Sequence, residues 1–194
     1  MPRVDSGVTV RPCLGEAQSG DAALVLPVDG GHLACIVDAL GHGEGAHAAA
    51  LKAVAFLSNA PGADVESLMS GLNEQLRGTV GAAIGLCHVD EDSGALSYVS
   101  VGNTVLRLFG QREVRLVSQD GIVGSRMRTP KAQQMSLALG DVVLMHTDGV
   151  SERFGLEDYP ELLGHAPATV TRVVVRRFGK AHDDAGCIVL RYSK

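Results

Sequence analysis

The sequence predicts an α+β protein in which two antiparallel β-sheets are sandwiched between helices, and two observations predict it. Most apolar stretches between Gly7 and Arg115 are short, rich in valine or leucine, and bounded by Gly, Asp or Asn, which is the pattern of strands joined by hairpins. Two segments with helical spacing interrupt these runs, and further helix and strand patterns follow Pro130. Strands, a helix pair, a strand meander and then helices with strands form an order typical of an αββα sandwich.

The elements follow from local patterns in chain order. Strands are expected at residues 8–10, 22–28, 33–37, 82–89, 96–101 and 105–109, separated by turn sequences such as Asp92-Ser93-Gly94. Helices are expected at 45–57, which is rich in alanine, and at 65–76, where leucine occupies every fourth position. After these come strands at 134–139 and 142–145, helical segments at 157–163 and 169–178, and a closing strand at 187–192.

Length and charge limit the classes of function. The chain has 194 residues, of which 45% are hydrophobic, and we expect one domain over residues 1–194. Its 17 Lys and Arg against 22 Asp and Glu give a net charge of −5, which argues against non-specific nucleic-acid binding. We also expect a monomer.

Neither the apolar runs nor the cysteines indicate a membrane or secretory protein. No apolar run approaches the roughly 20 residues that span a bilayer, and the first residues lack the pattern of a signal peptide. Cys13, Cys35, Cys87 and Cys187 form no C-x-x-C pair, which argues against a zinc ribbon, and we expect buried thiols. The expected location is the cytoplasm.

Acidic residues lie beside the ends of several predicted strands. Asp38 follows Ile36-Val37, Asp148 follows Met145-His146-Thr147, the pair Asp183-Asp184 precedes the closing strand, and Asp21 opens the second strand. Each alone is an ordinary turn former. Four such acids in one small domain indicate a divalent cation, because a carboxylate beside an apolar strand is costly unless it is compensated. Ligands that are all oxygen favour Mg²⁺ or Mn²⁺ over zinc.

The motifs that contain these acids resemble those of a known family. Ser-Gly-Asp at 19–21, Val-Asp-Ala-Leu-Gly-His-Gly at 37–43, Thr-Asp-Gly-Val at 147–150, Asp-Asp-Ala at 183–185 and the turn Val-Gly-Asn-Thr at 101–104 carry the resemblance. In order and spacing they are similar to the PP2C-type metal-dependent serine/threonine phosphatases, in their SpoIIE-like bacterial branch. Because no sensor segment is expected ahead of the domain, the layout is most similar to stand-alone stressosome phosphatases of the RsbX type.

The resemblance implies two Mn²⁺ or Mg²⁺ ions at one end of a β-sandwich. Asp38 would bridge both ions, and the carbonyl of Ala39 would replace the family's usual glycine carbonyl. Asp148 and Asp183 would hold one ion, with Asp184 as the competitor of Asp183, and Asp21 would act through a bound water. Asp38, Asp148 and Asp183 are thus the expected catalytic residues.

The chain departs from the wider family in three places. Ala39 replaces a glycine, and alanine cannot adopt the φ values open to glycine. Leu40 stands where animal members have a histidine that acts as a general acid, so His42 or a metal-bound water is left to protonate the leaving group. No arginine directly precedes Ser19-Gly20-Asp21.

Basic residues are the remaining candidates for contact with an anionic substrate. The cluster Arg126, Arg128 and Lys131 lies in a loop that could steer a phosphoprotein toward the metals, whereas Arg172, Arg176 and Arg177 are interpreted as a solvated helix face.

The function implied is hydrolysis of phosphoserine and phosphothreonine on regulatory partner proteins by water activated between two metals. The expected partners are stressosome scaffold proteins or anti-anti-sigma factors, both of the STAS type. The alternative is a catalytically weak phosphatase-like binding module in a partner-switching pathway. A hydrolase of small phosphate esters ranks last, because the sequence has neither a P-loop nor a Rossmann fingerprint.

Overall fold

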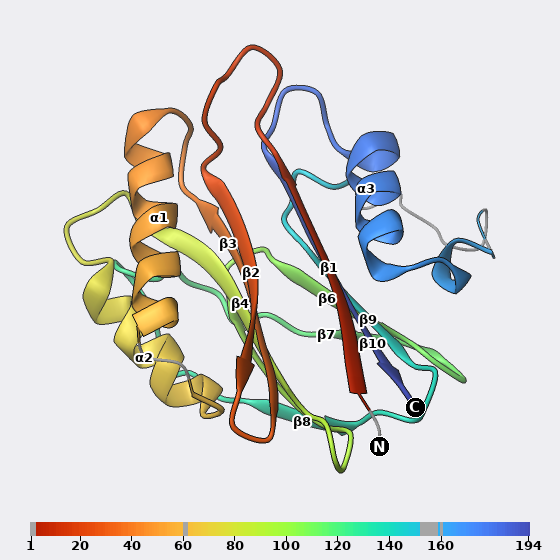
Figure 1. The fold of residues 1–194 in the computed structure, drawn as a ribbon. Helices are drawn as coiled ribbons and strands as arrows, with labels where there is room; N and C mark the ends of the chain where they lie inside the picture. The colour runs from red at the N-terminus through yellow and green to blue at the C-terminus, as the bar shows by residue number, and fades with distance from the viewer. Residues whose placement is uncertain (1–2, 60–61, 152–158, 160) are drawn as a thin grey trace.

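The computed structural model, which describes residues 3–59, 62–151, 159 and 161–194, contains two five-stranded antiparallel sheets packed face to face (Figure 1). One sheet has the order β1-β10-β9-β6-β7, with β1 (Arg3–Arg11), β10 (Ala185–Ser193), β9 (Val142–His146), β6 (Val105–Phe109) and β7 (Glu113–Leu116). The other has the order β2-β3-β4-β5-β8, with β2 (Asp21–Val28), β3 (Gly31–Ala39), β4 (Ala82–Asp90), β5 (Ala95–Val101) and β8 (Gln133–Ser136).

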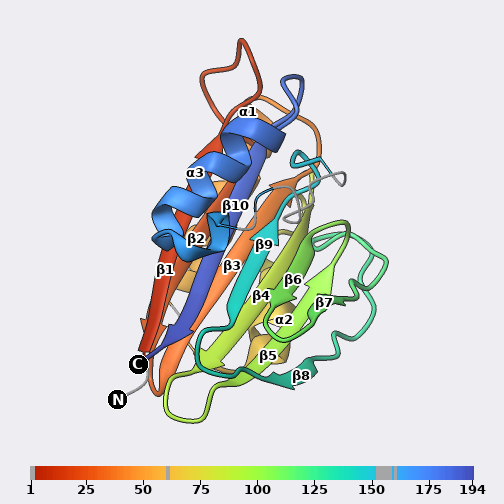
Figure 2. The same cartoon turned by 90° about the vertical axis from the view of Figure 1, so that its right-hand side faces the viewer.

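Helices cover the outer face of each sheet, so the αββα prediction is confirmed (Figures 1 and 2). α1 (Glu44–Asn59) and α2 (Val65–Gln75) pack on the sheet that contains β3. α3 (Pro167–Phe178) and the short 3₁₀ helix η2 (Leu162–Gly164) pack on the sheet that contains β10. None of the described helices is both long and apolar enough to cross a membrane.

This stacking produces three apolar layers. β3 lies between two of them, which explains why its sequence is almost continuously apolar. Leu33 and Cys35 face α1 and α2, whereas Ala34 and Ile36 face the second sheet, and all four are fully buried. A strand buried on both faces cannot alternate between polar and apolar residues.

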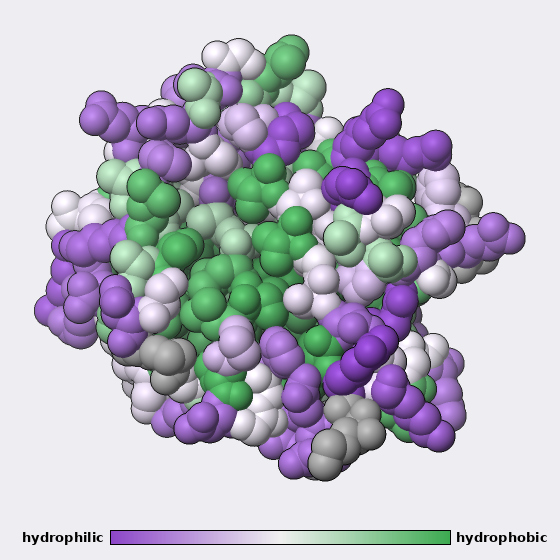
Figure 3. All heavy atoms as spheres, viewed as in Figure 1, coloured by the Kyte–Doolittle hydropathy of each residue, from purple (hydrophilic) through white to green (hydrophobic). Residues whose placement is uncertain are grey.

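The open edge of the sandwich, where β1 and β2 lie side by side, exposes apolar side chains such as Val8 (Figure 3).

Most expected strands and helices are present, with two differences. β1 begins at Arg3 rather than near residue 8, because its first residues pair fully with β10 although most of them are not apolar. The short strand β7 was not expected, since two of its four residues are charged. The helix expected at 157–163 lies largely outside the described residues, and within them η2 begins at Leu162. All four cysteines are free thiols, three buried and Cys13 half-buried.

Candidate metal centre

Asp21 and Asp38 lie side by side at one end of the sandwich. Asp21 begins β2, Asp38 is the next-to-last residue of β3, and the antiparallel register makes the two residues direct partners. Side chains alternate along β3, so Asp38 shares the face of Ile36 and points toward the other sheet. The hairpin therefore delivers two carboxyl groups to the space between the sheets.

Thr147 joins these acids to the second sheet. Its hydroxyl donates a 2.6 Å hydrogen bond to Oδ2 of Asp21 and accepts a 2.9 Å bond from the Gly186 N–H. Thr147 is fully buried, so both bonds are shielded from water. Sequence reasoning noted the Thr-Asp-Gly motif for its aspartate and missed this role of the threonine.

Asp148 and the pair Asp183-Asp184 come from the paired ends of β9 and β10. Gly149 permits this close approach, because a Cβ at that position would lie 1.6 Å from the carbonyl oxygen of Asp184. Asn103, in the turn between β5 and β6, donates a 2.7 Å hydrogen bond from Nδ2 to Oδ2 of Asp148. The 101–104 turn, which the sequence indicated only as a family motif, thus holds one of the predicted site acids.

Burial and mutual repulsion raise the pKa values of these acids. Burial, followed by the charges of Asp148 and Asp183, raises the pKa of Asp38 to about 7. Burial, followed by the charge of Asp38, raises the pKa of Asp21 to about 8. The pKa of Asp183 is also raised, first by burial and then by the charge of Asp148. The structure therefore brings acids from both sheets within range of one another's charge.

The chemistry of this cluster fits a hard divalent cation. Oδ2 of Asp38 is buried and has no hydrogen-bond partner among the described residues, which is costly for a carboxylate oxygen. Among the described residues, no three His, Cys, Asp or Glu side chains are gathered closely enough to hold a metal ion by themselves. Mg²⁺ commonly binds through one or two carboxylates and keeps several waters, so an open set of oxygen ligands suits it.

Adjacent acids Asp183 and Asp184 have different surroundings. The Asp184 carboxylate accepts hydrogen bonds from the N–H groups of Cys13, at 2.8 Å, and Gly20, at 2.6 Å. It is buried and fastens the loop between β1 and β2 to the start of β10. Asp183 is half-buried, and burial, followed by the charge of Asp148, raises its pKa.

Ala39 is accommodated without strain. Its N–H donates to the Gly20 carbonyl at 3.1 Å, and its side chain is buried beneath α1. No described residue other than glycine has a positive φ, so this position does not require the conformational freedom of glycine. The positive φ values fall instead on Gly41 and Gly43, where the chain turns from β3 into α1.

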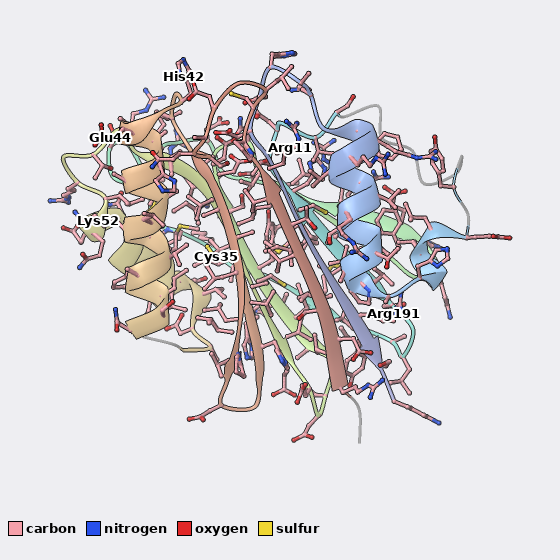
Figure 4. The ribbon with its side chains drawn as sticks, turned by 45° about the horizontal axis from the view of Figure 1, so that its top comes forward. Arg11, Cys35, His42, Glu44, Lys52 and Arg191 are labelled. Atoms are coloured by element: carbon pink, nitrogen blue, oxygen red, sulfur yellow. The ribbon has the colours of Figure 1, made fainter. Side chains whose placement is uncertain are left out.

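The histidines near the cluster do not enter it. The His42 side chain is 79% exposed, with Nδ1 3.8 Å from Oε1 of Glu16, and lies on the outer surface of the loops (Figure 4). Nδ1 of His47 is 2.8 Å from the carbonyl oxygen of Ser19, so His47 connects α1 to the loop before Asp21. His182 is exposed on the loop before β10.

The two adjacent acids should differ in their effect on stability. Asp184→Ala leaves two backbone N–H groups without their acceptor, and we expect it to lower the free energy of unfolding by about 2 to 4 kcal/mol. The matched variant Asp183→Ala removes a repelling charge and should leave that free energy unchanged or raised. Urea denaturation with EDTA measures both, and equal losses for the two variants would contradict the anchoring role of Asp184.

The raised pKa values also determine how stability depends on pH. Without metal, the folded chain retains protons on Asp21 and Asp38 at pH values where the unfolded chain has lost them. Stability is therefore lost as pH rises through these values. We expect the free energy of unfolding in EDTA to fall as the pH rises from about 6.5 to about 8.5. The interval starts at about pH 6.5 because ordinary histidines become neutral there and contribute little above it. Asp21→Asn should show a smaller fall, and a rise over this interval in the unaltered chain would refute the assignment.

Comparison with known proteins shows which family the chain resembles. The family model described as Stage II sporulation protein E (SpoIIE) matches residues 29–193. No curated protein matches the sequence.

Many solved structures share the fold, and three of them match nearly the whole of this chain. A protein solved in work on the bacterial stressosome as a modular system adapted to control secondary messenger signaling has a TM-score of 0.90 at 28% identity, covering 97% of this chain and 100% of its own. RsbX in complex with magnesium has a TM-score of 0.83 at 18% identity, covering 98% and 96%. The PP2C phosphatase domain of SpoIIE from Bacillus subtilis, solved with a fragment of its regulatory domain, has a TM-score of 0.78 at 19% identity, covering 99% and 64%. The chain therefore belongs to the SpoIIE family and has the PP2C phosphatase fold.

Proposed function

We propose that residues 1–194 form one cytoplasmic PP2C-type phosphatase domain that hydrolyses phosphoserine and phosphothreonine on regulatory partner proteins. The observation that carries the proposal is the convergence of Asp38, Asp148 and Asp183 from two sheets, with one buried oxygen of Asp38 left unpaired. A cluster of repelling acids destabilises the fold, so its presence in a SpoIIE-family chain supports a binding role for the acids.

The residues present fit the two Mn²⁺ or Mg²⁺ ions that this family is expected to use. We propose that Asp38 contacts both ions, with the carbonyl of Ala39 beside it, and that Asp148 and Asp183 hold one ion. Asp21 acts through a bound water. When bound, the ions neutralise the phosphoryl oxygens and lower the pKa of a water, which supplies the nucleophile.

The protein's own contribution is orientation. Asn103 fixes one oxygen of Asp148, and Thr147 fixes one oxygen of Asp21. Asp184 holds the loop that ends at Asp21. These bonds set the direction of the carboxylates before a cation or substrate arrives, which limits the reorganisation that the reaction requires.

The proposed substrates are phosphorylated stressosome scaffold proteins of the STAS type, in preference to a free anti-anti-sigma factor. The similarity to a protein solved in work on the bacterial stressosome and to RsbX supports this choice. The net charge of −5 supports a protein rather than a nucleic-acid partner.

A second candidate function is a phosphatase-like binding module that has lost efficient catalysis. The open arrangement of the acids favours it, because no three ligand side chains among the described residues form a ready metal cage. Metal binding separates the two candidates, since a binding module has no need of divalent ions.

Metal dependence is the first prediction of the proposed function. Hydrolysis of p-nitrophenyl phosphate and of a phosphothreonine peptide should require Mn²⁺ or Mg²⁺ and stop in EDTA. Asp38→Asn should lower kcat/KM by about a thousandfold or more, because it removes the ligand expected to serve both ions. Isothermal titration with Mn²⁺ should show the corresponding loss of binding.

The control for this variant is Asp29→Asn, an exposed acid in the turn between β2 and β3 at the other end of the sandwich (Figure 1). It should retain activity. Near-full activity of Asp38→Asn would refute the two-metal proposal, and a chain that binds no Mn²⁺ would favour the binding module.

His42 gives a second prediction. Because its side chain is mostly exposed and paired with Glu16, His42→Ala should lower kcat by tenfold or less. Steady-state kinetics with the same aryl phosphate measure this. A loss above about a thousandfold with unchanged Mn²⁺ binding would make His42 the general acid.

A further inference from the structure

A groove of about 770 Å³ lies between β1 and α3, outside the carboxylate cluster. We call it the β1–α3 groove. Thr9 and Arg11 of β1 line one side, and Thr169, Arg172, Val173 and Arg176 of α3 line the other. The α3 residues are three or four positions apart and therefore share one face of the helix. The arginines of this helix, expected from the sequence to form a solvated face, are exposed, and Arg172 and Arg176 lie over a concave surface.

The groove is positive in a chain that is negative overall. Arg11, Arg172 and Arg176 line it, no Asp or Glu is among the described residues that do so, and the net charge of the chain is −5. None of these arginines forms an ion pair with a described carboxylate. Arg172 and Arg176 are exposed, so their charges are available to a ligand.

Arg11 is a fixed charge at the groove. Its guanidinium donates hydrogen bonds to the carbonyl oxygens of Pro12, at 2.7 Å, and Lys180, at 2.8 Å. It also lies 3.4 Å from the Asp183 carbonyl oxygen. These bonds to neutral groups hold the side chain and leave its positive charge uncompensated. Figure 4 shows Arg11 near the loops that carry the site acids.

One end of the groove approaches the backbone of Asp183, whose carbonyl oxygen the groove residue Arg11 reaches. Ala181 lines the groove two residues before Asp183, and its carbonyl accepts a 2.9 Å hydrogen bond from the Leu14 N–H. Leu14 lines the same end of the groove. That hydrogen bond holds its backbone, yet Leu14 is 84% exposed, which is a large exposure for a leucine in an ordered position. The basic loop at 126–131 lies elsewhere, beside α2. Just before this loop, the Gly124 N–H donates a hydrogen bond to the Asn73 side chain of α2.

We propose that the β1–α3 groove binds an acidic, extended segment of the phosphoprotein substrate, next in sequence to the phosphorylated residue. This proposal rests on the proposed phosphatase function. Carboxylates of the segment pair with Arg172 and Arg176, an apolar side chain contacts Leu14, and the adjoining phosphoresidue reaches the cluster beside Asp183. The stretch of α3 from 169 to 176 rises about 10 Å, which matches about three residues of extended chain.

Such a segment resolves an electrostatic difficulty. A phosphoprotein is anionic, and the negative net charge of this chain slows its approach at long range. Over distances shorter than the Debye length of about 8 Å at physiological salt, the arginines of the groove are the charges that the segment meets first. Binding there gives selectivity for acidic flanking sequences rather than for any phosphoresidue.

The test compares Arg176→Glu with Arg177→Glu. These residues are adjacent on α3 and the charge change is the same, but Arg177 lies over the Tyr159 ring, 5.3 Å from its centroid, and outside the groove. The probes are two labelled phosphothreonine peptides that differ only in four flanking residues, Asp and Glu in one and Asn and Gln in the other. Fluorescence anisotropy gives Kd, and hydrolysis with Mn²⁺ gives kcat/KM.

Arg176→Glu should weaken binding of the acidic peptide at least tenfold at about 50 mM NaCl, and Arg177→Glu by less than threefold. The neutral peptide should show no difference between the variants, and the effect should shrink at about 0.5 M NaCl. The milder double variant Arg172→Gln/Arg176→Gln should lower the acidic-to-neutral ratio of kcat/KM toward one. Thermal denaturation of each variant shows whether it is folded.

Equal losses in Arg176→Glu and Arg177→Glu, or an acidic-to-neutral ratio that the double variant leaves unchanged, would overturn the docking proposal. Tighter binding of a ten-nucleotide oligothymidylate than of the acidic peptide would also overturn it, in favour of a general polyanion site. Failure of the phosphatase proposal has a separate signature, in which neither peptide nor p-nitrophenyl phosphate is hydrolysed with Mn²⁺ while the acidic peptide still binds through Arg176.

Discussion

Repulsion among buried carboxylates at one end of the sandwich is the constraint on which the rest of the structure depends. Asp21 and Asp38 come from one sheet and Asp148 from the end of the other. Burial and like charge raise the pKa values of Asp21 and Asp38, so both oppose ionisation of these two acids. The fold withstands this through strand register and the Thr147–Asp21 hydrogen bond, which joins the two sheets. The extensive apolar layers on either side supply the stability that this end of the molecule loses.

The same constraint explains why two neighbouring acids have different tasks. Asp184 turns inward and satisfies backbone N–H groups of the loop between β1 and β2, which is bonding that an uncharged side chain such as alanine does not provide. Its bonds place Gly20 and hence Asp21. Asp183, one residue earlier, remains at the rim of the cluster, where it feels the charge of Asp148. One acid holds the loop in place, and the other is the acid proposed to hold a metal ion.

Much of the fold was predictable because the apolar pattern of each strand reflects its burial, as the continuous run of β3 shows. The strand-end position of the acids was predictable for the same reason. The partners of these acids were not, because Thr147 and Asn103 act through contacts between segments distant in sequence. The exposure of His42 was not predictable either, since a Gly-His-Gly turn does not define the direction of the histidine side chain. The β1–α3 groove depends on the packing of α3 across β1, which a helix pattern alone does not specify.

The proposed docking groove and the carboxylate site share one stretch of backbone. Arg11 holds the carbonyl of Lys180 from the groove side, while Asp184 holds the N–H of Cys13 from the site side. Both ends of the 180–184 loop are therefore fixed to the end of β1 and the loop that follows it. The groove and the carboxylate cluster are therefore two faces of a single loop pair rather than independent surfaces. A segment bound along α3 would rest against the backbone that positions Asp183. Docking would then fix the distance and orientation of the phosphoresidue relative to the carboxylates, and no part of the protein would need to move.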